Sequence, residues 1–243
     1  MLDKLSDVDD SPLWRPISED EVMTAINRQK SKAASTIGLS PHDLKLLSTA
    51  ILQQLTNIFN NCMDRSIFVN EWLESKMFYL HKKGNRSDPG NFRSINIQNP
   101  FLKIFNTVLN NRLTEYAECN NLLPWFQFGF RKRRSTVSAA SLLHEVAESR
   151  LSQGKRTYAC FVDFTKAFDK IDRTLLFSKL QNMSIPYKFC SILFHIFNNT
   201  KMFIQAGEFL SEPFCSNIGT PQGDVISPLL FSLFLNDIEA WIP

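Results

Sequence analysis

The sequence has little of what marks a membrane or secreted protein. No stretch approaches the ~20 consecutive apolar residues that cross a bilayer, and the N-terminus, MLDKLSDVDDSP, is acidic rather than an apolar signal segment. We therefore expect an intracellular protein that is neither secreted nor membrane-bound. The cysteines are odd in number, form no CxxC pair and are expected to be reduced core thiols: Cys62, Cys119, Cys160, Cys190 and Cys215.

Basic residues are concentrated in one part of the chain, although the net charge over 243 residues is only +3. Between Lys76 and Arg134 there are eleven basic and three acidic residues, which gives this span +8 and leaves −5 for the remainder. A field of that sign suits a polyanion. A solvated basic surface accounts for the charge equally well, so charge alone leaves both alternatives open.

The segment from Tyr158 to Asp172, YACFVDFTKAFDKID, contains the most informative acid of the chain. Its apolar run 158–162 is typical of a buried strand, and Asp163 stands at the end of that run. A carboxylate there is costly to desolvate unless it is paired or holds a metal. Asp163 is therefore either a salt-bridged structural acid, which is the commoner case, or a metal ligand.

The remaining sequence predicts a mixture of helices and short strands. Helices are expected over about 19–29, 41–62, 100–119, 136–152, 172–182, 186–198 and 226–241, with a capping box at Ser18 and Glu21. The helix over 41–62 is expected to turn Ile51 and Ile58 inward. Hairpins are expected where 77–80 pairs with 94–97 across a basic turn, and where 202–206 pairs with 210–215.

Four consecutive basic residues precede the helix that is expected to begin near Ser135: Arg131, Lys132, Arg133 and Arg134. A helix N-terminus carries partial positive charge and free N–H donors, so added cations are unfavourable there without an anion. That conflict favours a phosphate contact over a bare surface patch. A nuclear-localisation signal is the weaker alternative.

At VDFTKAFDKID (162–172) and GTPQGDVISPLLFSLFLND (219–237), the sequence resembles the reverse transcriptases of non-LTR (LINE-like) retrotransposons. Three further blocks agree in order, namely HKKGNRSDPGNFRSI, FLKIFNTVLNNRL and LLPWFQFGFRKRRST, and the match covers the chain from Trp14 onward. The resemblance implies an α+β right-hand polymerase. An acidic stretch at 1–17 would precede helical fingers over 18–155 and a partial, ferredoxin-like palm over 156–243, with the thumb absent.

The resemblance also implies template-directed phosphoryl transfer, in which two Mg²⁺ ions activate a primer 3′-hydroxyl against the α-phosphate of a deoxynucleotide. Asp163 matches the first catalytic aspartate, and the main-chain carbonyl of Phe164 would complete its share of the metal shell, because Mg²⁺ prefers oxygen ligands. Phe168 matches the aromatic steric gate against a 2′-hydroxyl; otherwise it is one core phenylalanine among 21. Asp169 is expected to be a turn or cap acid.

Other residues are implied to bind the substrates, which are an RNA template, a DNA primer and deoxynucleoside triphosphates. Lys82 or Lys83, with Arg93, match the fingers residues that hold the triphosphate. Gln222 matches the residue beside the incoming nucleotide, and Gly223 lets the backbone approach the template base. The residues implied to hold template phosphates without reading sequence are Gly129, Arg131, Lys132, Arg133 and Arg134.

The sequence departs from the family pattern at several positions. The Tyr/Phe-x-Asp-Asp hairpin that carries the other metal-binding acids does not follow Asn236-Asp237, and the acid pair Asp9-Asp10 lies outside any expected strand. Ile37 replaces an aspartate and Ser94 a proline of the family blocks. We therefore expect a fragment truncated before the second catalytic motif and inactive by itself, with the Asp163 strand beside an open gap and an exposed apolar patch.

Three hypotheses remain. The chain is part of an RNA-directed DNA polymerase, a catalytically silent module that binds RNA or DNA through its +8 span, or a transposon relic too incomplete to fold. If the protein is expressed, the nucleus is a plausible location.

Overall fold

The computed structural model describes residues 11–29, 38–39 and 41–241. It is a mixed α/β fold, and its helices are α1 (Glu19–Asn27), α2 (Pro41–Leu44), α3 (Thr49–Arg65), α4 (Pro100–Cys119), α5 (Thr136–Ser152), α6 (Arg173–Asn182), α7 (Tyr187–Asn199) and α8 (Ser227–Phe234). The strands are β1 (Glu74–His81), β2 (Phe92–Gln98), β3 (Lys201–Ala206) and β4 (Phe209–Leu210). Most of the acidic N-terminal stretch, including Asp9-Asp10, and Ile37 lie outside the described residues.

Local capping signals place most of the helices where the sequence predicts them. Ser18 and Glu21 form the expected capping box at the start of α1. The side chain of Asn99 accepts a hydrogen bond from the amide of Phe101 at the start of α4, and Ser135 and Asp172 cap α5 and α6 in the same way. Because these side chains satisfy amides that have no partner within the helix, they fix where each helix begins.

Two predicted helices are shorter than expected. The helix expected over 41–62 is divided into α2 and α3, since Ser48 has an extended conformation and begins α3 as its N-cap. Ile51 and Ile58 are exposed rather than inward, because the buried face of α3 follows Leu52, Leu55 and Phe59. The helix expected over 226–241 ends at Phe234 and is followed by a short 3-10 helix, Ile238–Trp241.

The sheet has the order β2-β1-β3-β4. β1 and β2 form the long antiparallel hairpin that the sequence predicts, in a register from Ser75 opposite Gln98 to His81 opposite Phe92. β1 also pairs in parallel with β3. The second hairpin is shorter than expected: β4 has two residues, and beyond it only an isolated bridge joins Met202 to Phe214.

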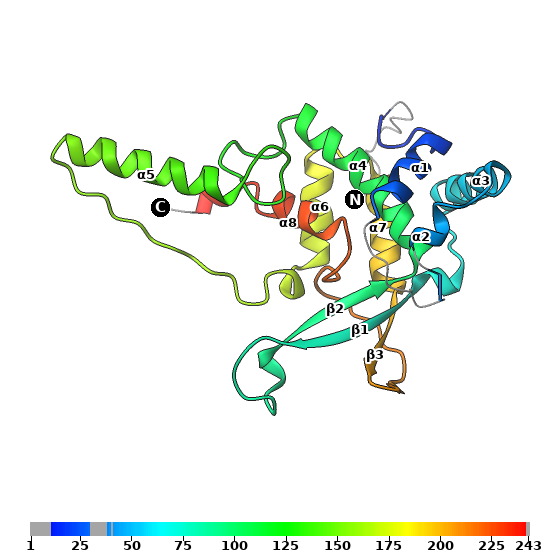
Figure 1. Ribbon diagram of the computed structural model, residues 1–243. Coiled ribbons are helices and arrows are strands. Elements are labelled where there is room, and N and C mark those ends of the chain that lie inside the picture. Colours follow the sequence, from blue (N-terminus) through cyan, green and yellow to red (C-terminus); the bar gives the residue numbers. More distant parts are fainter. Residues whose placement is uncertain (1–10, 30–37, 40, 242–243) are drawn as a thin grey trace.

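A helical core lies behind this sheet. In Figure 1, α4 lies between α6 on one side and α1 and α3 on the other. Phe59, Phe105, Phe189 and Phe197 are among its largest fully buried side chains, which agrees with the richness of the chain in phenylalanine. Within the described ranges, no helix is both long enough and apolar enough to cross a bilayer.

The five cysteines are free thiols, but the expectation that they lie in the core holds for only two of them. Cys62 and Cys190 are buried, and burial raises the pKa of these thiols to about 11 and about 12. Cys119, Cys160 and Cys215 are exposed.

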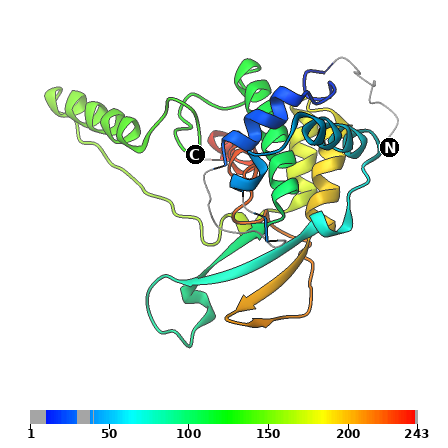
Figure 2. The ribbon, with the colours of Figure 1, turned by 45° about the vertical axis from the view of Figure 1, so that its right-hand side comes forward.

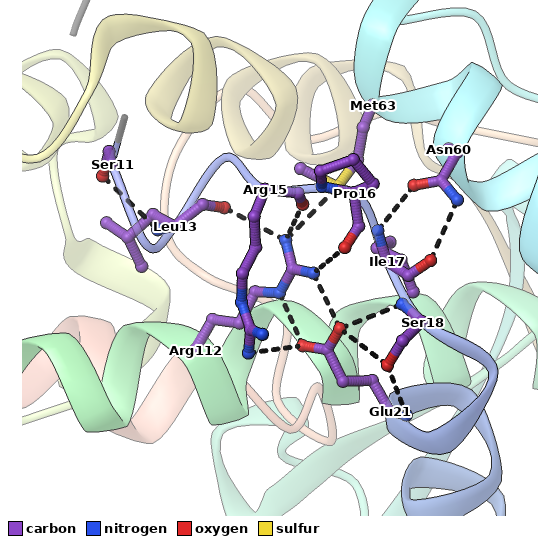
Figure 3. Close-up of polar contacts among 10 residues, drawn as sticks. All are labelled: Ser11, Leu13, Arg15, Pro16, Ile17, Ser18, Glu21, Asn60, Met63 and Arg112. Carbon is purple, nitrogen blue, oxygen red and sulfur yellow. Dashed lines mark hydrogen bonds and ion pairs between the residues drawn. The ribbon is translucent and has the colours of Figure 1, made fainter. Parts of the chain in front are cut away.

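The side chain of Arg112 fastens the N-terminal segment to α4 (Figure 3). It is 3% exposed, and its Nε and Nη2 atoms both donate to the carboxylate of Glu21 at 2.8 Å. Its remaining N–H groups donate to the carbonyl oxygens of Leu13, Arg15 and Pro16. The Glu21 carboxylate also accepts from the amide of Ser18, so one ion pair joins the capping box of α1 to the middle of α4.

The strand expected over 158–162 is wrong for this structure. Residues 155–164 form an irregular segment, in which the side chains of Tyr158, Phe161 and Val162 are 86%, 84% and 76% exposed. α5, which precedes this segment, contains no buried residue, and both extend from the helical body as an arm (Figures 1 and 2). A strand is stable only when a neighbour pairs with its backbone, and no described strand pairs with 158–162. The apolar side chains of this segment are therefore exposed to solvent, and the expected strand is not present.

Candidate functional site

The turn formed by residues 219–224 lies between the helical body and the sheet. The amides of Gly219 and Thr220 donate to the carbonyl oxygens of Ile171 and Phe168, each at 2.8 Å. On its other side, the amide of Asn96 in β2 donates to the carbonyl oxygen of Gln222 at 2.8 Å. The turn thus joins the 168–171 segment to the middle of β2, two parts of the chain far apart in sequence.

Two glycines make this junction possible. Gly219 has φ +75°, and a Cβ there would lie 2.7 Å from the carbonyl oxygen of Asp169. Gly223 has φ +111°, and a Cβ there would lie 2.5 Å from the carbonyl oxygen of Asn96. Both the positive φ and the close backbone approach exclude a larger residue.

The structure brings three of the predicted site residues together at this turn. The side-chain amide of Gln222 donates to Asp169 Oδ1 at 2.9 Å, Phe168 binds the turn through its carbonyl, and Gly223 packs on β2. Asp169, expected to be a turn or cap acid, lies in the short 3-10 helix Phe168–Lys170. The ring of Phe168 is half-buried beside Phe231 of α8, with ring centroids 5.1 Å apart, and beside Phe130 at 6.3 Å.

Asp224 is a buried acid that the sequence reasoning missed. Its Oδ2 accepts from the side-chain amides of Gln98 and Asn106 at 2.9 and 3.0 Å, and its Oδ1 accepts from the amide of Ile226. Burial raises the pKa of the Asp224 carboxyl, although these hydrogen bonds oppose the shift. The signal available in the sequence was an acid placed between a glycine turn and a strongly apolar helix.

Arg173 was missed as well. It is 5% exposed, and all of the acceptors recorded for it are neutral oxygens. It donates to Phe197 and Asn198 at the end of α7, and to the carbonyl oxygens of Ser216, Ile218 and Gly219 just before the turn. Its position one residue after the helix cap Asp172 gave no hint of this role.

Asp163 and Phe164 lie at the end of the arm, where Asp163 is exposed. The ring of Phe164 is 6.3 Å from that of Phe231, which is also the neighbour of Phe168. Among the residues with described positions, no group of three or more His, Cys, Asp or Glu side chains could hold a metal ion.

The basic residues of the β1–β2 hairpin are exposed. Lys82 and Lys83 follow β1, where the amide of Lys82 closes the hairpin by donating to Asn91, and Arg93 lies near the start of β2. Figure 1 shows the hairpin extending away from the helices. Its three cations are accessible to a large anionic ligand.

The four basic residues before α5 have different surroundings. Arg131 donates through Nε and Nη2 to Glu118 at 2.8 and 2.7 Å, and through Nη1 to the carbonyl of Pro124. The hydrogen bonds from Arg131 hold the pKa of the Glu118 carboxyl below its usual value. The guanidinium of Arg134 lies over the ring of Phe128, and Lys132 and Arg133 are exposed.

Gly129 lies in the turn before these residues, where its carbonyl accepts from the side chain of Gln127. Arg131 is thus held by protein groups, while its neighbours remain available to phosphate.

Known proteins match most of the length of this chain. Residues 80–243 match the family model described as reverse transcriptase (RNA-dependent DNA polymerase). The chain is 26% identical over 226 residues to the probable RNA-directed DNA polymerase from transposon BS of Drosophila melanogaster, covering 92% of this chain and 25% of that protein. It is 25% identical over 206 residues to the RNA-directed DNA polymerase from mobile element jockey of Drosophila melanogaster, covering 84% and 22%.

It is also 25% identical over 231 residues to the Pol polyprotein from the type-1 retrotransposable element R2 of Nasonia vitripennis, covering 95% and 22%. The chain thus spans about a quarter of the length of these curated relatives. Among solved structures, it is similar to a chain of a partial Cas6-RT-Cas1–Cas2 complex, with a TM-score of 0.48 and 16% identity over 94% of this chain and 34% of the other.

Proposed function

Because the chain belongs to the reverse transcriptase (RNA-dependent DNA polymerase) family and is related to the enzymes of non-LTR retrotransposons, we propose that it is the part of such a polymerase that receives the incoming deoxynucleotide. In this proposal residues 18–155 supply the fingers and residues 156–243 part of the palm. The ligands are an RNA template, a DNA primer and deoxynucleoside triphosphates, and the reaction is extension of the primer along the template.

One observation carries the proposal, namely the junction of the 219–224 turn with Phe168, Asp169 and β2. Gln222 Nε2 is 2.9 Å from Asp169 Oδ1, and the carbonyl of Gln222 binds Asn96. A side chain and a backbone held in this way form a rigid surface, and rigid surfaces discriminate between ligands of similar shape better than mobile ones do.

Phe168 is proposed as the residue that selects the sugar. Its ring is packed against Phe231 and Phe130, so it cannot withdraw without disturbing both contacts. A ring fixed in this way would clash with a ribose 2′-hydroxyl but would tolerate a deoxyribose. Discrimination by a clash of this kind needs a wall that does not move.

The residues present do not fit a complete two-Mg²⁺ site. Asp163 offers a hard oxygen ligand of the kind that Mg²⁺ prefers, and the carbonyl of Phe164 offers another. Two ions need further carboxylates, and the described residues assemble no group of three or more metal-binding side chains. We propose that nucleotide addition needs carboxylates beyond those that the described residues bring together.

A second candidate function is nucleic-acid binding without synthesis. The exposed cations of the β1–β2 hairpin, Lys82, Lys83 and Arg93, favour it because they are available to phosphate groups without any metal.

A paired assay tests both candidates. In the first arm, the chain is mixed with an RNA template, an annealed DNA primer, deoxynucleoside triphosphates and Mg²⁺; we expect no extension by this chain alone. Extension that Asp163→Asn abolishes would establish the polymerase and overturn the second candidate.

In the second arm, the same duplex is titrated at increasing salt. We expect an affinity that falls steeply with salt and a slope that decreases by about 0.7–0.9 for each phosphate contact removed in Lys82→Ala, Lys83→Ala and Arg93→Ala. Lys201→Ala, at an exposed lysine of β3, is the matched control. Binding that does not respond to salt would contradict both candidates.

A further inference from the structure

Two buried ionisable side chains, Arg173 and Asp224, flank the 219–224 turn, and both form their hydrogen bonds with neutral groups. Arg173 contacts the chain that enters the turn, and it donates only to backbone carbonyl oxygens and a side-chain amide oxygen. Asp224, at the end of the turn, accepts only from amide N–H groups. A buried ion is costly unless its hydrogen-bonding capacity is filled, so both residues need this arrangement of backbone and side chains.

We propose that Arg173 and Asp224 are positioning residues that fix the 219–224 turn, and with it Gln222 and Gly223, against β2 and the 168–171 segment. The role assigned to the turn in nucleotide binding rests on the proposed function, whereas its anchoring is a separate, directly measurable claim.

Arg173 joins the end of α7 to the chain that enters the turn. On one side Nη1 donates to the carbonyl of Phe197 at 2.9 Å and to Asn198 Oδ1 at 2.7 Å. On the other side Nε donates to the carbonyl of Gly219 at 2.7 Å, and further bonds reach 216 and 218. A planar guanidinium can span acceptors on two segments at once, which a lysine ammonium cannot do in the same geometry.

Asp224 joins the end of the turn to three other elements. Gln98 is the last residue of β2, Asn106 lies in α4, and Ile226 is the N-cap of α8. All three donate to the one carboxylate. Replacing this carboxylate by an apolar group would leave two buried side-chain amides without their acceptor.

The backbone of the turn between Arg173 and Asp224 is held in close contact with its neighbours. Gly219 touches the backbone of Asp169 and Gly223 touches the backbone of Asn96, at distances that leave no space for a Cβ. A small displacement at either anchor therefore moves the Gln222 carbonyl relative to Asn96.

The substitution Asp224→Asn offers a conservative rescue. The side-chain oxygens of Gln98 and Asn106 have no hydrogen-bond partner, although both are buried. If either amide rotates by half a turn, its oxygen can accept from the side-chain NH₂ group that the substitution introduces, and the connection to β2 or α4 is kept. Leucine, which is branched at Cγ in the same way but has no polar atom, cannot form this hydrogen bond.

The test is amide hydrogen exchange in Asp224→Leu and Asp224→Asn, with Glu208→Gln as a matched removal of an exposed acid. We expect Asp224→Leu to speed exchange at the amides of Asn96 and Thr220 by about tenfold or more, the effect of losing one strong hydrogen bond. Exchange in α3 should not change, and Asp224→Asn should stay within a few-fold of wild type. Unchanged exchange at the turn, or equal acceleration in α3, would overturn the proposal.

If Asp224→Leu does not fold, Arg173→Lys tests the other anchor. It is expected to speed exchange at the amide of Gly219, while Arg65→Lys, at an exposed arginine, has no effect. Unchanged exchange at Gly219 would overturn the anchoring role of Arg173.

A titration with dTTP and Mg²⁺ on the same variants separates this proposal from the proposed function. If wild type binds no dTTP but the turn is mobilised as expected, the proposed function fails and the anchoring stands. If wild type binds dTTP and Asp224→Leu changes neither affinity nor exchange, the anchoring fails alone.

Discussion

Replacing either turn glycine by alanine should lower the free energy of unfolding far more than the same change at an open glycine that also has a positive φ. Gly223 has φ +111° and Gly219 has φ +75°, and in both cases the added Cβ meets backbone, at 2.5 Å and 2.7 Å. Gly207 and Gly154 also have positive φ, at +61° and +70°, but nothing lies within 4 Å of a Cβ there. All four variants place a Cβ at a positive φ, and only Gly223 and Gly219 add a collision with backbone.

The magnitude follows from these contacts. A positive φ costs an L-residue about 1–2 kcal/mol, which is the whole effect expected at Gly207 and Gly154. At Gly223 the carbonyl of Asn96 must also move, and the hydrogen bond between the Asn96 amide and the Gln222 carbonyl, now 2.8 Å, is lost with it. An unsatisfied backbone group adds about 1–3 kcal/mol, so Gly223→Ala should destabilise by about 2–5 kcal/mol.

Equilibrium unfolding in urea measures all four variants, and a titration with a deoxynucleoside triphosphate follows on those that remain folded. We expect Gly223→Ala and Gly219→Ala to lose both stability and nucleotide affinity, whereas Gly207→Ala and Gly154→Ala lose only the stability due to strain. Equal free energies of unfolding for Gly223→Ala and Gly207→Ala would refute the reasoning.

Three further predictions concern other parts of the chain. Arg112→Lys should lower the free energy of unfolding in urea by about 3 kcal/mol, because a lysine cannot keep both charged hydrogen bonds to Glu21 and the bonds to three carbonyls. Arg65→Lys is the control. A loss below about 1 kcal/mol in Arg112→Lys would contradict the role of Arg112 in holding the N-terminal segment to α4. Burial alone would raise the pKa of the Glu21 carboxyl, but hydrogen bonds from Arg112 and Ser18 hold it below 4.5. The stability that Glu21 contributes is therefore present above pH 4.5 and lost as pH falls through the lower pKa of the folded state, and Glu21→Gln should remove this part of the acid sensitivity in pH-dependent unfolding. Phe161→Glu should slow aggregation, measured by light scattering, without changing the unfolding midpoint, since the ring lies exposed on the arm. An unchanged aggregation rate would show that the molecules do not associate through the arm.

Local sequence signals were sufficient for much of the fold. The caps at Ser18, Asn99, Ser135 and Asp172 act within three residues, so they could be recognised without knowing the tertiary structure. The long β1–β2 hairpin followed in the same way from two apolar runs around a basic turn.

The strand expected over 158–162 failed for the opposite reason. An apolar run indicates which residues favour burial, but a strand also needs a partner for its backbone, and the partner is a property of the tertiary structure. The prediction of the buried face of α3 was wrong for a similar reason. Leu52 rather than Ile51 is buried, and which of the two faces the core depends on how the neighbouring helices pack.

The candidate site was only partly predictable. The glycines and Gln222 were found because the turn has a compact motif, whereas Asp224 and Arg173 were missed because isolated charged residues are usually exposed. Their burial follows from backbone acceptors and amide donors contributed by several separate elements, and no local pattern reports such an arrangement. The bidentate bond between Arg131 and Glu118 was hidden likewise, because the partners are 13 residues apart across a turn.

The most direct test of the account is the ratio of the dissociation constants for GTP and dGTP, measured on wild type and on Phe168→Ala, with Phe209→Ala as a control at an exposed ring. The account predicts that wild type prefers dGTP by about tenfold or more, as a single steric or hydrogen-bonding mismatch can provide. The preference should fall towards one in Phe168→Ala and stay unchanged in Phe209→Ala. A wild-type ratio near one, or a ratio that Phe168→Ala leaves unaltered, would contradict the assignment of this turn as the deoxynucleotide site.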